Sequence, residues 1–340
     1  MGKYQFALDS ELPWDKLKHA NVLITGANGM IASVFTETLL AVNKEKDLQM
    51  NVYALSRNAE RAGKRFEKHL ADPAFHILAQ DVTEPLPPAV DFQYIIHAAS
   101  AAHPDAMNNH PVDVMRANFI GTMNLLEYAR GCSHCRFLFV SSSEVYGENT
   151  NELPYFTEDM AGDVIFTRFR ACYPESKRAS ETLCQCYKKQ YGCDVVVVRP
   201  AFIYGKNIID DNTRADVYFL RQALAHKDIV MFSKGEQIRS YCYVNDCVLG
   251  MLFVLLKGEN GEAYNIGDKN CEISLRDYAQ KLADAANVSL ILDTDSKPSS
   301  TVFLKTTKLI LDTGKLEKLG WHPQYSLDDG IQDIFNNEET

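Results

Sequence analysis

The chain has 340 residues, of which 46% are hydrophobic and 24% are charged. It carries 35 Lys and Arg against 45 Asp and Glu, which gives a formal net charge of −10 at pH 7. This composition is typical of a folded globular protein and argues against disorder, and the acidic balance argues against a nucleic-acid partner. No window approaches the roughly 20 apolar residues that a membrane helix needs, so we expect no membrane partner.

Short apolar runs alternate with helical patterns through most of the first 200 residues. Strands are predicted where these runs are apolar on both faces, at residues 21–24, 52–55, 75–78, 94–97, 137–140 and 195–198. Helices are predicted at residues 30–42, 112–129 and 173–191. Strands of this kind, spaced by helices, indicate a parallel sheet that is covered on both sides. The predicted fold class is α/β, with a Rossmann-type doubly wound parallel sheet.

The last third of the chain follows a different pattern. Residues 201–340 mix polar loops, short strands and helices such as the one predicted at 275–286. This stretch is too small and irregular to repeat the first domain. We therefore predict a main domain over residues 1–200 and a smaller C-terminal α/β cap over 201–340 that binds substrate, with residues about 240–258 returning to the main domain. Ligands of such sheets bind at the carboxyl ends of the strands, so the cleft should lie between the two parts.

Cysteine use and the start of the chain indicate the compartment. The nine cysteines are an odd number, and the one C-x-x-C stretch, residues 132–135, has no second ligand pair at metal-site spacing. The first 18 residues hold three acidic side chains and no apolar core of a signal peptide. We expect free thiols, no metal site and a cytoplasmic location.

A glycine turn follows the first predicted strand. Gly26 permits the tight turn, Gly29 lets the backbone approach a pyrophosphate, and Ala32 is small enough for close packing of helix on strand. The helix that follows offers free N–H groups and a positive dipole end to phosphates. The turn therefore predicts that residues 1–200 bind a dinucleotide cofactor. The cofactor contacts expected here are Gly26, Asn28, Gly29, Met30 and Ile31.

The end of the second strand bears on the choice of cofactor. NAD sites usually place an acidic residue there, whereas this chain has Ser56 followed by Arg57. Arg57 could pair with the 2′-phosphate of NADP, or it could lie over the adenine or in solvent. NAD and NADP both stay open, with a slight preference for NADP. Asp81 and Val82, after the third strand, are expected to flank the adenine.

Tyr173 and Lys177 are four residues apart on one predicted helix, so their side chains share a face. A free phenol has a pKa of about 10 and is a poor base at neutral pH. A nearby ammonium and a positive nicotinamide ring would both favour the phenolate and make Tyr173 a useful base. The strand ending at residue 140 delivers Ser142, Ser143 and Glu144 to the same edge, where a serine hydroxyl can orient an alcohol.

These motifs, taken together and in this order, resemble the extended, nucleotide-sugar-modifying branch of the short-chain dehydrogenase/reductase superfamily. The resemblance implies further cofactor contacts at Ala98, Ala99, Ser100, Asn118 and Pro200, besides Tyr173 and Lys177. It also implies a homodimer that pairs through the helices at 112–129 and 173–191. The stretches that carry it are TGANGMI (25–31), HAA (97–99), Asn118 with Gly121 and Thr122, residues 173–177 and VND (244–246).

Within that branch the chain looks most like the UDP-glucuronate decarboxylases. The similar stretches are RACYPESKR (170–178) with ETLC (181–184), SSEVYG (142–147) and QIRSY (237–241). The resemblance implies oxidation of the sugar at C4 by a tightly bound cofactor, loss of carbon dioxide from C5 and re-reduction by the same cofactor. Ser142 would hold the C4 oxygen, Tyr173 would be the base, and Lys177 would lower the Tyr173 pKa and bind the nicotinamide ribose. Glu144 would line the C5–C6 side of the sugar, and Arg239 would pair with phosphate or protonate the enolate.

The chain departs from the decarboxylase pattern in the substrate region. Phe202 stands where that family has a substrate-contacting Asn, and Met107 stands at the position of a Tyr. Glu144 could instead face solvent, and Arg239 could be a diphosphate ligand only. Glu175 and Arg178 lie off the Tyr173 face and are expected to be surface charges.

Four alternatives to decarboxylation stay open. A nucleotide-sugar 4-epimerase needs only Tyr173, Lys177, the serine and room for the keto sugar to turn. A 4,6-dehydratase usually has an Asp-Glu pair where this chain has Ser143 and Glu144, which makes it less favoured. An NADPH-dependent keto-sugar reductase agrees with Arg57. A redox-sensing NAD(P)-binding protein would not need the intact Ser, Tyr and Lys set.

Overall fold

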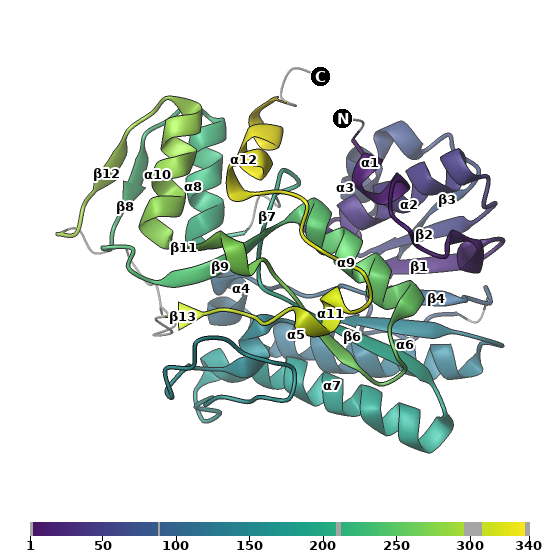
Figure 1. Ribbon diagram of the computed structural model, residues 1–340. Coiled ribbons are helices and arrows are strands. Elements are labelled where there is room, and N and C mark those ends of the chain that lie inside the picture. Colours follow the sequence, from purple (N-terminus) through teal and green to yellow (C-terminus); the bar gives the residue numbers. More distant parts are fainter. Residues whose placement is uncertain (1–2, 88, 209–211, 296–307, 337–340) are drawn as a thin grey trace.

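The computed structural model describes residues 3–87, 89–208, 212–295 and 308–336. Within these residues the largest element is a seven-stranded sheet with the order β10-β6-β5-β4-β1-β2-β3 (Figure 1). Every neighbouring pair in this sheet is parallel. The strands are β1 (Asn21–Thr25), β2 (Asn51–Ser56), β3 (Phe75–Ala79), β4 (Tyr94–His97), β5 (Arg136–Val140), β6 (Asp194–Pro200) and β10 (Ala263–Ile266).

Alternate residues of these strands enter two separate hydrophobic clusters, one on each face. Ile24, Ile96 and Leu138 pack on one face, against α2 (Met30–Lys46) and α9 (Val244–Lys257). The intervening residues of the same strands pack on the other face, against α6 (Gly121–Gly131) and α7 (Cys172–Tyr191). Because both faces are buried, the strands are apolar throughout, as the predicted pattern requires. The doubly wound parallel sheet is confirmed.

The order of the strands reverses between β1 and β4. From β1 the chain moves outward to β2 and β3, and it then returns to pair β4 with the other side of β1. In sheets of this kind the ligand crevice lies beyond the carboxyl ends of the strands at such a reversal, which here are those of β1 and β4. A short helix follows each of two strands in the chain: α3 (Ala59–Arg65) comes after β2, and α4 (Pro104–Asn109) comes after β4.

The helix predicted at 112–129 is interrupted in the structure. It comprises α5 (Pro111–Met115), a π-helical turn at Arg116–Ile120 and then α6. Asn118 in this turn is fully buried, and its amide Nδ2 donates a hydrogen bond of 2.9 Å to Ser176 Oγ on α7. The backbone carbonyl of Asn118 accepts from Ser180 Oγ at 2.9 Å. These contacts hold α7 against the irregular turn, a kind of turn that is frequent at functional sites.

The smaller part of the molecule surrounds β9 (Ile238–Tyr243), which pairs with β7 (Phe202–Tyr204), β11 (Glu272–Ser274) and β13 (Lys308–Leu309). The helices α8 (Ala215–Leu224) and α10 (Leu275–Ala286) lie side by side next to it (Figure 1). The remaining α-helices and strands are α1 (Gln5–Leu8), β8 (Ile229–Met231), β12 (Leu290–Leu292), α11 (Gly314–Glu317) and α12 (Leu327–Asn336).

The chain returns to the main sheet through α9 and β10. Helix α9 packs between α2 and β6, and β10 adds a seventh strand beside β6, which sequence analysis did not anticipate. Asp246 on α9 accepts backbone N–H bonds from Gln324 and Tyr325, at 2.9 and 3.1 Å. These bonds tie the segment before α12 to the main domain.

Three further observations concern disulfides, metal sites and membrane-spanning helices. All nine cysteines lie in the described ranges, and none of them forms a disulfide there. Among the described residues, no three or more His, Cys, Asp and Glu side chains are grouped so as to hold a metal ion. No described helix combines the length and the apolar character that crossing a bilayer requires.

Candidate active site

The glycine turn after β1 lies against the loop after β4. Gly26 has a φ of 66°, and a Cβ added to it would lie 2.6 Å from the Cα of Ala99. Thr25 Oγ1 accepts the backbone N–H of Ala99 at 3.2 Å and bonds to His97 Nδ1 at 2.8 Å. Only glycine allows this turn and this approach together. The two loops therefore form one wall of the crevice.

Helix α2 begins at this wall. Its N-cap is Gly29, which has no side chain to accept from the first N–H groups of the helix. Open N–H groups and the positive end of a helix dipole suit a phosphate. Met30 and Ile31, which begin the helix, are partly buried against the main core.

Several buried polar atoms around the crevice have no hydrogen-bond partner in the described structure. Asn28 donates through Nδ2 to Ser56 Oγ at 2.8 Å, but its Oδ1 is unpaired. Buried polar groups are normally paired, so such a group of atoms indicates a polar ligand or water. With the open helix end, these residues fit a dinucleotide. The other unpaired atoms of this kind are His97 Nε2, Ser100 Oγ, Asn118 Oδ1 and Ser141 Oγ.

The residues predicted for the adenosine end also lie together. The Arg57 side chain is 73% exposed, and its Nη1 is 3.9 Å from Asp81 Oδ2. Val82 is buried and packs against Gly121, where an added Cβ would lie 2.9 Å from Val82 Cγ1. Pro200, predicted as a further cofactor contact, is buried at the carboxyl end of β6.

Lys177 is buried beneath the carboxyl edge of the sheet. Its Nζ donates to the carbonyl oxygen of Val140 at 2.7 Å and lies 4.7 Å from the centre of the Phe139 ring. Lys177 is only 2% exposed. Burial lowers the pKa of Lys177 to about 7 because a desolvated ammonium is unfavourable.

Tyr173 is buried beside Lys177, with the lysine Nζ 5.9 Å from the centre of its ring. The pKa of Tyr173 is raised to about 12, first by burial and then by the negative charge of Glu144. A hydrogen bond with Ser142 and the charges of two arginines act in the opposite direction. In the chain without a cofactor the pKa of Tyr173 therefore lies above its ordinary value, because desolvation outweighs the opposing interactions. That Lys177 lowers this pKa when a cofactor is bound stays a prediction.

The segment after β5 brings Ser142, Ser143 and Glu144 to the same edge. Ser142 Oγ accepts the backbone N–H of Glu144 at 3.1 Å, which caps a short 3₁₀ turn at Ser143–Tyr146. Ser143 is buried. The carboxylate of Glu144 accepts from Arg170 Nη2 at 3.1 and 3.3 Å, so it is paired rather than turned to solvent. Sequence analysis missed this role of Arg170, although it stands three residues before Tyr173.

The two predicted substrate residues of the smaller part lie in contact. The guanidinium of Arg239, on β9, lies 4.3 Å from the centre of the Phe202 ring, on β7. The strands β7 and β9 are paired in parallel, with Phe202 opposite Tyr241. Phe202 therefore provides an aromatic face for the arginine in place of an amide. Met107 is buried in a small cluster with Tyr173.

Arg178 is not the surface charge that the helical spacing predicts. Its Nε donates to the carbonyl of Val145 at 2.7 Å and its Nη2 to the carbonyl of Gly162 at 2.9 Å. Its Nη1 pairs with Glu175 at 3.2 Å. The guanidinium thus fixes the loop that carries Glu144, because that loop folds back over α7 and covers this face of the helix.

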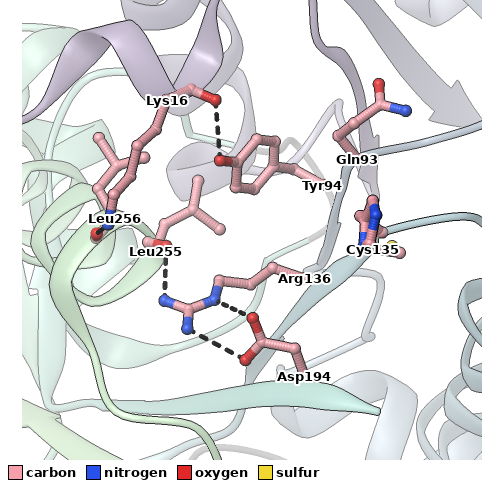
Figure 2. Close-up of a pocket in the computed structure, with 9 residues that line it drawn as sticks. Lys16, Gln93, Tyr94, Cys135, Arg136, Asp194, Leu255 and Leu256 are labelled. Carbon is pink, nitrogen blue, oxygen red and sulfur yellow. Dashed lines mark hydrogen bonds and ion pairs between the residues drawn. The ribbon is translucent and has the colours of Figure 1, made fainter.

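A hollow lies at the opposite, amino edge of the sheet. It has a volume of about 360 Å³ and lies at the amino ends of β4, β5 and β6 (Figure 2). Arg136 pairs with both carboxylate oxygens of Asp194, at 2.7 and 3.1 Å, and donates to the carbonyls of Leu255 and Gly258. Figure 2 shows the Arg136 guanidinium directed at Asp194 and at the carbonyl of Leu255. They form a structural pocket with no sign of a reacting centre.

The amino-acid sequence of residues 22–267 matches the model of the NAD dependent epimerase/dehydratase family. The chain belongs to this family. UDP-glucuronic acid decarboxylase 5 of Arabidopsis thaliana is 31% identical to it over 311 residues, which are 91% of this chain and 86% of that protein. UDP-glucuronic acid decarboxylase 1 of Xenopus tropicalis is 30% identical over 316 residues, 91% of this chain and 70% of that protein.

Solved structures of family members share the fold. A UDP-glucuronic acid 4-epimerase from Bacillus cereus superposes with a TM-score of 0.79 at 23% identity, covering 93% of this chain and 98% of that one. A dTDP-glucose 4,6-dehydratase from Streptomyces venezuelae has a TM-score of 0.78 at 25% identity, covering 94% and 98%. The resemblance to an extended, nucleotide-sugar-modifying branch is thereby confirmed at the level of the family, while the roles assigned to single residues stay predictions.

Proposed function

We propose that this protein binds NAD or NADP tightly, oxidises a nucleotide sugar at C4 and decarboxylates UDP-glucuronate. The observation that carries the proposal is the buried Tyr173–Lys177 pair beside Ser142, with the Glu144–Arg170 ion pair at the same edge. The names of the relatives at about 30% identity support the decarboxylase reaction over its alternatives.

The chain's own residues handle the sugar and its proton. The hydroxyl of Ser142, which bonds with Tyr173, holds the C4 oxygen of the sugar, and Tyr173 removes the proton from the C4 hydroxyl of the sugar. When bound, an oxidised nicotinamide supplies the hydride acceptor and a positive charge that favours the Tyr173 phenolate. Lys177 holds Tyr173 in place from beneath through its contact with the end of β5.

The C5–C6 side of the sugar distinguishes the possible reactions. A ketone at C4 places the C6 carboxylate in the β-position, so the C5–C6 bond breaks with its electron pair passing to an enolate and carbon dioxide leaving. We expect Glu144, in the 3₁₀ turn after β5, and Arg239, on β9, to face this side of the sugar. Dehydration would need an acid for the C6 hydroxyl, and Glu144 is engaged with Arg170 while Ser143 is no acid.

We also propose a cytoplasmic homodimer that pairs through the α5–α6 segment and α7. Val112 and Met115 on α5 are 67% and 45% exposed, and Tyr191 at the end of α7 is 44% exposed. Such apolar side chains on neighbouring helices suit a helix-on-helix contact between copies. Sedimentation of the purified protein at micromolar concentration tests this, because a monomer would contradict it.

A panel of nucleotide sugars, read by mass spectrometry, tests the reaction. With UDP-glucuronate we expect a product lighter by one carbon dioxide. A product of unchanged mass but different retention would indicate epimerisation, and loss of water from UDP-glucose would indicate dehydration. Either result, without decarboxylation, would contradict the proposal. Retention of cofactor through gel filtration, seen in the absorbance, would separate a self-recycling enzyme from a reductase or a sensor.

A further inference from the structure

Two cysteines stand at the two ends of the turn between α6 and β5. Cys132 is the C-cap of α6, and Cys135 directly precedes β5. The backbone bends at residues 132–134, and the carboxylate of Asp91 accepts the backbone N–H of Ser133 at 3.1 Å. The C-x-x-C spacing therefore brings the two thiols to one short turn whose backbone is held in place.

The two thiols are in direct contact. The Cys132 thiol is hydrogen-bonded to the Cys135 thiol, and it donates to the carbonyl of Tyr128 at 3.5 Å. Side chains that already meet in this way can close to a disulfide with little movement of the backbone, which is what the narrow geometry of a disulfide requires. Within the described ranges, no three or more His, Cys, Asp and Glu side chains are grouped so as to hold a metal ion. The pair thus fits thiol–disulfide chemistry better than a metal site.

A small molecule in solvent can reach this pair. Cys132 and Cys135 are both partly exposed, and the two residues between them are exposed. Cys135 and His134 also line the hollow at the amino edge of the sheet, where Figure 2 labels Cys135. Most of the other cysteines are closed to solvent. The buried ones are Cys172, Cys184, Cys242, Cys247 and Cys271.

Cys193 is a third thiol at the same edge. The strands β5 and β6 pair in parallel with Arg136 opposite Asp194, and Cys135 and Cys193 each stand one residue before these positions. The charge of Cys193 acts on Cys135, so the two side chains are near each other. The hydrogen bond of Cys135 goes to Cys132, which makes Cys132 the expected partner and Cys193 the alternative that an experiment must exclude.

The contact gives the two thiols different roles. The hydrogen bond with Cys135 lowers the pKa of Cys132, and burial and the negative charge of Asp91 oppose this without reversing it. The same bond, followed by burial, raises the pKa of Cys135. Because the thiolate is the form that attacks a disulfide, Cys132 is the attacking thiol and Cys135 the one that reacts second.

We propose that Cys132 and Cys135 form a reversible redox site that exchanges with small-molecule disulfides. The Cys132 thiolate attacks one sulfur of the external disulfide, whose S–S bond breaks and whose other half leaves as a thiol. Cys135 then gives up its proton and attacks Cys132 Sγ, which forms the Cys132–Cys135 bond and releases the second thiol. Two cysteine thiols are thus oxidised by two electrons, and one small disulfide is reduced to two thiols, which carry the two cysteine protons.

This inference goes beyond the proposed function and does not depend on it. The cysteine pair lies at the amino edge of the sheet, whereas Tyr173 and Lys177 lie at the carboxyl edge. A disulfide that forms and breaks, rather than a permanent one, also agrees with the proposed cytoplasmic location.

Titration of the native protein with mixtures of reduced and oxidised glutathione tests this, with mass spectrometry after the free thiols are blocked in acid. Trypsin cleavage after Arg130 and Arg136 releases both cysteines in one peptide, residues 131–136. We expect this peptide to lose two hydrogens as oxidised glutathione increases and to regain them in reduced glutathione. Cys193 lies in a different tryptic peptide, so a Cys135–Cys193 disulfide would link two peptides and overturn the inference.

Exposed Cys186, on α7, is the internal control for general thiol reactivity. If Cys186 takes up glutathione while peptide 131–136 keeps two free thiols, the inference fails. Circular dichroism on the same samples shows whether the protein is folded when the disulfide forms. A disulfide that appears only in urea would also overturn the inference, because it would belong to the unfolded chain.

Two serine variants separate the attacking thiol from the one that reacts second. Cys135→Ser should accumulate a mixed disulfide between Cys132 and glutathione, because the thiol that would displace the glutathione is gone. Cys132→Ser should react with oxidised glutathione at this peptide about tenfold more slowly, since the remaining thiol is less acidic. Cys186→Ser, as the matched control, should leave the disulfide of the pair unchanged. Equal reaction rates of Cys132→Ser and Cys135→Ser would contradict the proposed sequence of attack.

Discussion

The two edges of the main sheet hold similar polar side chains in opposite conditions. At the amino edge, Arg136 is bonded to Asp194 and to two backbone carbonyls, and Lys16 Nζ donates to the carbonyl of Leu256 at 2.7 Å (Figure 2). At the carboxyl edge, Asn28, His97 and other buried groups keep atoms without partners. A hollow alone therefore does not identify a site in this molecule, and the group of unpaired buried polar atoms at the carboxyl edge is the better indication of a bound ligand.

Several titratable groups at the carboxyl edge have shifted pKa values. Burial lowers the pKa of Lys177 to about 7 and that of His97 to about 3, and it raises the pKa of Tyr173 to about 12. Groups in this condition cost stability, and they persist where function requires them. The carboxyl edge thus holds buried titratable groups that cost stability and are candidates for a function.

Replacement of Tyr173 by Phe should give the largest effect and tests whether the carboxyl edge is the reacting one. We expect turnover of the nucleotide sugar to fall about 10²- to 10⁴-fold, because the group that takes the proton is removed. Cofactor binding should change by no more than a few fold, since the ring remains. Single-turnover assays and cofactor titration measure the two quantities. Near-normal turnover by the Tyr173→Phe variant would contradict the proposed mechanism.

Replacement of Arg136 by Met examines the amino edge. The variant leaves the Asp194 carboxylate and two carbonyls without their donor, so the free energy of unfolding should fall by about 1–3 kcal/mol. The constants kcat and KM should stay within about twofold of the native values. Urea denaturation and steady-state kinetics measure these. Lost turnover in a variant of native stability would show that this edge takes part in function.

Replacement of Lys177 by Met tests the stability cost of the carboxyl edge. The folded protein releases the Lys177 proton near pH 7, whereas the unfolded chain keeps it up to about pH 10.5. The unfolded state binds more protons in this window, so native stability should rise with pH between 7 and 10.5 through this group. The variant lacks that contribution, and its stability relative to the native protein should be greatest at pH 7 and decrease toward pH 10. Denaturant titrations across this range measure the difference, and a constant difference would contradict the assignment.

Replacement of Arg57 by Ala should have the smallest effect and concerns the cofactor. The side chain is largely exposed, so we expect the affinity for NADP to fall about fivefold and that for NAD to change less than about twofold. Fluorescence titration with each cofactor gives the ratio. An unchanged ratio of the NADP and NAD affinities would show that Arg57 only contacts Asp81 and does not bind the 2′-phosphate of NADP.

Part of the fold and of the candidate site could be predicted from the sequence. Strand runs, the turn at Gly26 and the spacing of Tyr173 and Lys177 are local patterns, because backbone geometry alone places residues four apart on one helix face. They predicted the sheet, the crevice and the catalytic pair. The strand β10 was missed because its short run, Ala263–Ile266, is recognisable only beside β6.

The sequence by itself determined the doubly wound sheet, the cofactor turn and the order of chemical groups along the carboxyl edge, since each depends on residues close together in the chain. Only the tertiary structure decided that Arg170 pairs with Glu144, that Arg178 fixes a loop and that the Tyr173 pKa rises. These outcomes depend on burial and on contacts between segments that are distant in sequence. Such contacts are set by how the helices and loops pack, and no local pattern encodes them.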